Sequence, residues 1–177
     1  MSQERSHGER DRDPTRVADY EAAHYRFDPE RFGWEGVERK AYAEPVAGRD
    51  FARIDRQVII GHHSGRPSMH LRYFELAPGG YSCLEKHRHE HLVIGARGAG
   101  QVIVGREVRE LRERDALYIG PDTPHQFVNP GPAPFGFFCV VPAERDRPRD
   151  LSAEELAAIE RDPVARAVLR RGPAESI

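Results

Sequence analysis

Short apolar runs follow one another from residue 51 to about residue 142, and each is bounded by Gly, Pro, Asn or Asp. Regularly spaced short strands separated by turn residues are typical of an antiparallel β-sandwich or β-barrel. No helical period interrupts the runs, which argues against a parallel α/β fold. The pattern therefore predicts an all-β domain with a turn at 77–80. The predicted strands cover residues 56–60, 68–76, 81–87, 91–97, 101–104, 107–111, 116–119, 126–128 and 135–141.

The two ends of the chain have a different character from this β-rich body, which we place at residues 51–145. Residues 1–16 are charged and nearly free of apolar side chains, so we expect a disordered tail. Aromatic residues return in 17–50, without a sustained period, and predict an extended arm that packs on the barrel or on a partner subunit. Exchange of this arm across a two-fold axis would build a homodimer, which we expect.

Residues 146–177 predict a short helical extension. Ser152 and Glu155 have the spacing of a capping box, which marks a helix start. Pro163 is suited to the first position of a second helix, and Gly172 would follow its end.

Composition narrows the class of protein. A length of 177 residues fits one domain, and a formal net charge of -2 argues against a nucleic-acid or membrane-surface protein. The sequence has no run of 18 apolar residues and no apolar core near its start, so we expect neither a membrane span nor a signal peptide. Its 2 cysteines imply no disulfide framework, and a cytoplasmic location is the simplest expectation.

The candidate chemistry is concentrated in two segments. Glu85, His87, His89 and His91 fall within seven residues, and His125 follows a proline-rich turn. Side chains alternate along a strand, so Glu85 and His87 would project to one side, with His91 opening the next strand. Three imidazoles and a carboxylate would leave open positions on an octahedral Mn, Fe, Co or Ni ion. The pair His62 and His63 lies in a loop, where we expect solvent-exposed side chains, because adjacent side chains point in different directions.

Both segments resemble the two motifs of the cupin superfamily, over roughly residues 68–142. The resemblance implies a jelly-roll β-barrel holding one divalent metal ion and forming dimers. The residues that carry it are Gly79, Gly80, Gly98 and Gly100 around the histidine cluster, and Arg114, Asp115, Pro121, His125 and Asn129 in the second motif.

The match implies a ligand set with one open question. His91 stands where the family usually has glutamate, which resembles a subset with four histidines that often holds manganese. A count without gaps puts Glu85 and His87 at the first two ligand positions. The alternative register, His87 with His89, leaves one residue before His91, too few for a turn between strands. We therefore favour Glu85, His87, His91 and His125 as ligands of Mn or Fe, with His89 as the alternative ligand and Ni, Co or Zn as the alternative metals.

Strand parity places further residues beside the ion. Phe127 shares a face with His125, and Phe137 and Cys139 share a face that the resemblance suggests looks inward, which predicts an apolar pocket for a small organic substrate. Parity leaves open whether Gln126 and Arg72 line the pocket. The function expected is that of a metal-dependent oxidoreductase, of the dioxygenase type. The alternatives are a metal-dependent isomerase or lyase and a non-enzymatic metal- or ligand-binding cupin.

Overall fold

The computed structural model describes residues 22–42 and 50–171. The predicted tail at 1–16 and Gly172 lie outside the described residues. The chain divides into two units, Met1–Val37 and Glu38–Ile177. In the first unit, β1 (Phe27–Asp28) and β2 (Gly33–Trp34) form a short antiparallel hairpin. The Phe27 ring packs against Phe32 and Trp34, at centroid distances of 5.0 and 5.3 Å, so the aromatic side chains of this segment stabilise one another.

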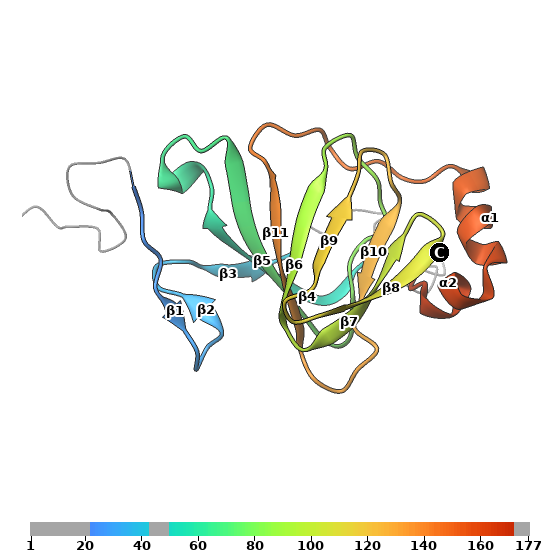
Figure 1. Cartoon of the computed structure of the whole chain (residues 1–177), viewed down its shortest axis with the longest axis horizontal. Coiled ribbons are helices and arrows are strands. Elements are labelled where there is room, and N and C mark those ends of the chain that lie inside the picture. The colour runs from blue at the N-terminus through green and yellow to red at the C-terminus, as the bar shows by residue number, and fades with distance from the viewer. Residues whose placement is uncertain (1–21, 43–49, 172–177) are drawn as a thin grey trace, which may run out of the picture. The chain divides into compact units, whose positions relative to one another are not determined.

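The second unit is an antiparallel β-barrel followed by two helices, which is the all-β jelly-roll architecture expected (Figure 1). Within its described residues, 9 strands form one sheet, in the order β8-β7-β10-β5-β11-β6-β9, with β4 paired to β5 and β3 paired to β4. The elements are β3 (Arg39–Ala41), β4 (Ala52–Ile60), a 3₁₀ helix η1 (His62–Ser64), β5 (Met69–Tyr81), β6 (His91–Arg97), β7 (Ala99–Val104), β8 (Glu107–Arg112), β9 (Ala116–Ile119), β10 (His125–Val128), β11 (Phe135–Pro142), α1 (Ala153–Arg161) and α2 (Pro163–Val168).

Strand β5 connects the parts of the barrel because it pairs with three other strands. On one side it pairs with β11 from Met69 to Leu76, which lies opposite Phe135. On its other side it pairs with β4. Its last residue, Tyr81, pairs with Val128 of β10 and with Ala52 of β4. One long strand in the middle of the sheet path therefore joins β10 on one side to β11 on the other.

Two sequence predictions within the barrel are wrong. The predicted turn at 77–80 lies inside β5, where Gly79 has a φ of +74° and the pairing with β4 shifts register. The predicted strand at 81–87 is a loop after Tyr81. Its backbone is held by isolated bridges, Glu85 to His125 and Lys86 to Arg149, rather than by a continuous ladder. The other predicted strands overlap observed ones.

The interior of the barrel is an apolar core built from side chains of facing strands. Phe135, Phe137, Cys139 and Val141 of β11 are all buried in it, which confirms both the shared face expected from alternation and the inward direction that the family resemblance implies. Gly100 is required at this core, because a Cβ there would lie 2.2 Å from the Phe135 ring.

The C-terminal helices pack on the outside of the barrel, where α2 contacts β7 and β8. Ser152 and Glu155 form the predicted capping box, and Asp162 caps α2 through its side chain. Both helices lie together at one end of the barrel, near β8 (Figure 1). Their apolar residues form a second buried cluster with the strands, comprising Ile103, Val128, Ile159, Ala165 and Val168.

Gln126 connects these helices to the barrel. Its side chain is fully buried, at 0% exposure. Its Nε2 donates to the carbonyl oxygens of Ser82 (2.9 Å) and Arg170 (2.8 Å), and its Oε1 accepts from the Arg170 backbone N–H (2.9 Å). The amide thus joins the loop after β5 to the segment after α2.

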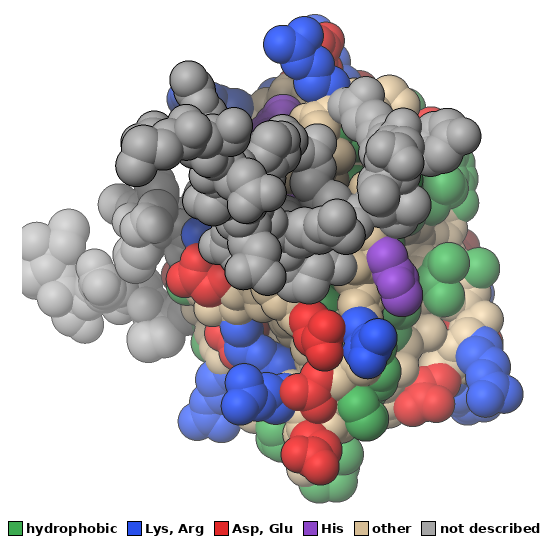
Figure 2. Space-filling view, turned by 90° about the vertical axis from the view of Figure 1, so that its left-hand side faces the viewer, with side chains coloured by type: hydrophobic (Ala, Val, Ile, Leu, Met, Phe, Trp, Pro, Cys, Tyr) green, Lys and Arg blue, Asp and Glu red, His purple; other side chains and the backbone are tan. Residues whose placement is uncertain are grey.

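Charged side chains on the barrel exterior are organised around Glu75. This carboxylate accepts from Arg39 (3.0 Å), Arg97 (2.7 Å) and the Tyr73 hydroxyl (2.7 Å). Burial alone would raise the pKa of Glu75, but these hydrogen bonds outweigh it and lower the pKa. Acidic and basic side chains are likewise interspersed on the face of the molecule drawn in Figure 2. Neither of the described helices is long and apolar enough to span a membrane.

Candidate metal centre

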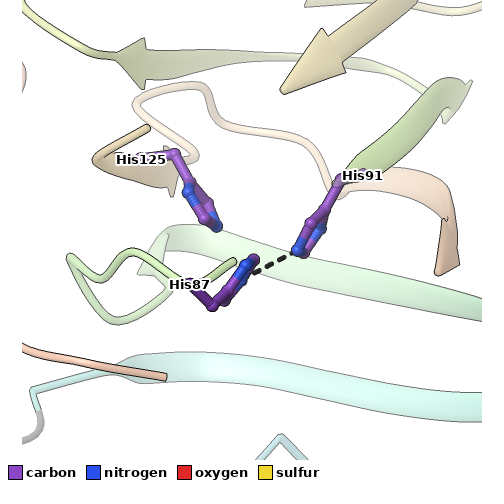
Figure 3. A group of neighbouring side chains, drawn as sticks. All are labelled: His87, His91 and His125. Carbon is purple, nitrogen blue, oxygen red and sulfur yellow. Dashed lines mark hydrogen bonds between the residues drawn. The ribbon is translucent and has the colours of Figure 1, made fainter. Parts of the chain in front are cut away.

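The imidazole rings of three buried histidines converge inside the barrel (Figure 3). One ligand nitrogen from each of His87, His91 and His125 lies within 4.8 Å of the other two. The Nε2 atoms of His87 and His91 are 2.8 Å apart. This is the only such group of metal-binding side chains in the described part of the chain.

Each ring comes from a different part of the fold. His91 is the first residue of β6 and pairs with Ile119 of β9. His125 is the first residue of β10, and its backbone exchanges two hydrogen bonds with Glu85. His87 lies in the loop before β6, where its carbonyl oxygen accepts from the Asp122 backbone N–H at 2.7 Å. Backbone pairing therefore positions all three side chains, although one of them lies on a loop.

The other ring nitrogen of each histidine is engaged, and for His87 and His125 the partner sets the tautomer. The Nδ1 of His87 lies 3.0 Å from the His89 carbonyl oxygen, and that of His125 lies 2.9 Å from the Thr123 carbonyl oxygen. A carbonyl only accepts, so each Nδ1 carries the proton and each Nε2 presents a lone pair. The Nδ1 of His91 lies 3.1 Å from the Cys139 sulfur. Such outer contacts are the usual means of orienting histidine ligands.

Burial keeps these rings neutral. It lowers the pKa of His87 and of His125 to about 4, and lowers that of His91 further, with help from the neighbouring imidazoles. Neutral imidazole is the form that binds a metal ion. Lone pairs that point at one another repel unless a cation or a proton lies between them. The donor set and its protonation therefore fit a divalent first-row metal ion.

Glu85 and His89, the competing fourth ligands, both line the same cavity as the triad. The Glu85 carboxylate lies 3.4 Å from the Tyr42 hydroxyl. The His89 ring stacks on His87, with centroids 3.7 Å apart, and its Nδ1 lies 2.8 Å from Asp146. Neither side chain belongs to the group of three whose ligand atoms lie within 4.8 Å of one another. The choice between them stays a prediction.

The triad lines a cavity with an empty volume of about 560 Å³, and this volume includes space open to solvent. One wall is aromatic, since the Phe137 ring stacks on Phe127 at 4.1 Å and on Phe74 at 5.4 Å. Cys139 lies between the triad and Arg72, whose Nη2 is 3.5 Å from the sulfur. Burial raises the pKa of this thiol, which keeps it protonated. The space suits a compact substrate with both apolar and polar parts.

The structure decides the residues that parity left open. Arg72 lines the cavity, whereas Gln126 points away from it and joins the C-terminal segment. Sequence reasoning missed Tyr42, Arg145 and Asp146, which also line the cavity. They lie outside both motifs, and no local pattern marks them. His62 and His63 are exposed, as expected for a loop pair.

Comparison with known proteins places the chain among proteins of the same fold. A family model described as "Cupin domain" matches residues 72–141. The chain is 37% identical over 139 residues to 1-methylthio-D-xylulose 5-phosphate methylsulfurylase of Rhodospirillum rubrum, covering 78% of this chain and 87% of that protein.

Two solved structures are similar over most of the chain. A cupin 2 conserved barrel domain protein from Rhodopseudomonas palustris has 35% identity and a TM-score of 0.74, covering 84% of this chain and 100% of that one. The cupin-2 domain protein Rru_A2000 from Rhodospirillum rubrum has 37% identity and a TM-score of 0.70, covering 80% and 93%.

Proposed function

Because this chain belongs to the cupin domain family, we propose that it is a metal-dependent enzyme acting on a small phosphorylated sugar that carries a methylthio group. The observation that carries the metal-dependent part is the buried triad of neutral imidazoles with converging Nε2 atoms. The similarity to the Rhodospirillum rubrum enzyme supports the substrate class, since its name specifies a methylthio ketopentose phosphate.

His87, His91 and His125 would hold the ion through Nε2. When bound, a divalent ion supplies Lewis-acid polarisation of a carbonyl or hydroxyl oxygen of the substrate. The aromatic wall of Phe127 and Phe137 gives a methylthio group an apolar surface and excludes water beside the triad.

The backbone carbonyls behind the histidines keep their rings oriented, so little reorganisation is needed when substrate enters. These residues favour chemistry at a polarised sugar carbonyl, of the isomerase or lyase type.

Metal content tests the first part of the proposal. We expect close to one Mn or Fe per chain by elemental mass spectrometry in wild type, and a loss of at least tenfold in His87→Ala or His125→Ala. The matched control is His62→Ala, which removes an exposed imidazole from the same domain. Equal metal content in all of these variants would refute a site at the triad. Glu85→Ala and His89→Ala, measured in parallel, decide the fourth ligand.

Turnover tests the second part. The metal-loaded protein is incubated with 1-methylthio-D-xylulose 5-phosphate, with and without a small thiol, and the substrate is followed by phosphorus NMR. We expect metal-dependent consumption that is lost in the His125→Ala variant. No consumption with any of Mn, Fe, Co or Ni would refute this substrate class. Oxygen uptake in the same samples tests the dioxygenase prediction, which is a separate hypothesis.

We also keep the homodimer as a proposal, from the aromatic segment in residues 17–50. Sedimentation equilibrium should give twice the mass of one chain. A single-chain mass at micromolar concentration would contradict it.

A further inference from the structure

Three buried side-chain nitrogens have no hydrogen-bond partner among the described residues, and all three are on neighbouring strands. They are Nε of Arg56, Nε of Arg72 and Nε2 of His70. Arg56 lies on β4, opposite Phe74 of β5, and Phe74 shares a face with Arg72 and His70. Buried polar groups in folded proteins are almost always paired, so a group of unpaired buried donors is a specific signal.

The unpaired nitrogen of His70 is a donor because of its other partner. Arg145 donates from Nη1 to His70 Nδ1 at 3.1 Å. Since an arginine can only donate, Nδ1 is the acceptor and the proton of a neutral ring is on Nε2. Burial, followed by the charge of Arg145, lowers the pKa of His70 and keeps it neutral. All three unpaired atoms are therefore N–H donors, which a group with acceptor oxygens would satisfy.

Positive charge is concentrated at the same place. Burial and then the neighbouring guanidinium of Arg72 lower the pKa of both Arg56 and Arg145. By contrast, Arg39 and Arg97 share the Glu75 carboxylate on the barrel exterior. Asp146, the acid next to Arg145 in sequence, is engaged by His89 and by the backbone N–H of Arg88.

Two of these arginines line the cavity of the metal centre, namely Arg72 and Arg145. Arg72 lies over the Phe74 ring, with its guanidinium carbon 5.2 Å from the ring centroid. Its Nη2 contacts the Cys139 sulfur at 3.5 Å, and the same sulfur is 3.1 Å from His91 Nδ1. The Cys139 side chain thus contacts both the Arg72 guanidinium and the His91 ring, so a single small molecule could reach both the arginine and the triad.

We propose that Arg72 and Arg145, backed by Arg56 and His70, form a subsite that binds the phosphate group of the substrate. Arginine forks match phosphate oxygens in a bidentate geometry, and a dianion in the cavity would satisfy the unpaired Nε of Arg72 and offset the clustered charge. The subsite deepens the proposed function and rests on it for the rest of the substrate. With the phosphate held by the arginines, the sugar would extend along the aromatic wall toward the triad.

Ligand binding to the full-length protein, as purified and after metal removal, tests the subsite. Isothermal titration calorimetry compares D-xylulose 5-phosphate with D-xylulose and with D-xylonate, which carries a carboxylate instead. We expect the phosphate ester to bind about 10–100-fold more tightly than D-xylulose, because hydrogen bonds to charged groups carry this discrimination. Inorganic phosphate should compete. D-xylonate binding as tightly as the phosphate ester would overturn the assignment to phosphate.

The variants Arg72→Met and Arg145→Gln should each reduce that preference at least tenfold while leaving the metal content unchanged. The matched control is Arg147→Gln, an exposed arginine two residues from Arg145 that does not line the cavity. If Arg72→Met misfolds by circular dichroism, Arg145→Gln alone carries the test. A preference for phosphate that persists in the folded variants would overturn the subsite.

This outcome can be separated from failure of the proposed function. Loss of the phosphate preference in the arginine variants, without turnover of the methylthio sugar by wild type, supports the subsite and refutes the reaction. Turnover without any preference for the phosphate ester refutes the subsite and leaves the reaction standing.

Discussion

Replacing Gln126 by leucine should weaken the attachment of the C-terminal helices to the barrel without disturbing the metal centre. The side chains are similar in size, so the change removes hydrogen bonds rather than volume. Three bonds are lost, to Ser82 and twice to Arg170, all between 2.8 and 2.9 Å. At about 1 kcal/mol for each bond, the free energy of unfolding should fall by about 3 kcal/mol. For a chain of 177 residues this corresponds to a decrease in Tm of roughly 6–12 °C.

Urea denaturation gives the magnitude, and hydrogen exchange gives the location. Amides in α1 and α2 should gain more in exchange rate in Gln126→Leu than those of β6 and β11, which should exchange faster only by the loss of global stability. The matched control is Gln101→Leu on β7, which is only half-buried. A decrease in the free energy of unfolding below about 1 kcal/mol would refute the role given to Gln126. A loss of metal binding with the helices still packed would refute it as well.

Three other perturbations test separate features. Gly100→Ala should cost about 1–3 kcal/mol of stability in urea, because its Cβ would lie 2.2 Å from the Phe135 ring, whereas at Gly120 the nearest atom is 3.5 Å away and alanine should be tolerated. Equal costs at the two glycines would contradict this packing. The lowered pKa of Glu75 means that its contribution to stability is present above the pKa of the unfolded chain and is lost as pH falls through the folded pKa. The difference in stability between wild type and Glu75→Gln should therefore be larger at pH 7 than at pH 3, and a constant difference would contradict it. Removing metal with a chelator should lower Tm, and adding Mn back at 100 times its Kd should restore about 2.7 kcal/mol in wild type but not in His91→Ala.

The barrel could be predicted from the sequence because the short apolar runs and the turn residues that bound them both indicate strands there. Alternation along 135–141 puts Phe137 and Cys139 on one face, the family resemblance correctly turns that face inward, and the family motifs bring His125 to the cluster from a distant segment. The capping box at Ser152 was also predictable, since its hydrogen bonds join residues three apart in sequence. These are features that local physics or a spaced motif can specify.

The failures have a common physical cause. The segment 81–87 has the composition of a strand, but after Tyr81 it forms only isolated bridges, with His125 and Arg149, and such distant partners cannot be read from a local pattern. Arg145 and Asp146 were missed as cavity residues for the same reason, since no local pattern shows which distant segments they approach. Parity assigns a face to a residue only when the strand is correct. It cannot assign residues in loops that the barrel closure brings together.

The alternation of side chains along β5 constrains how proteins of this kind can diverge in sequence. His70, Arg72 and Phe74 share one face of the strand, and Tyr73 and Glu75 share the other, where they belong to the exterior ion-pair group. Losing or gaining one residue would exchange the two faces at once, placing the carboxylate inside and the arginine outside. Descendants of this sequence can therefore alter ligand preference by substitutions along β5, but insertions and deletions should be confined to its ends. Lineages that differ in chain length should carry that difference elsewhere, as in the turn between β7 and β8.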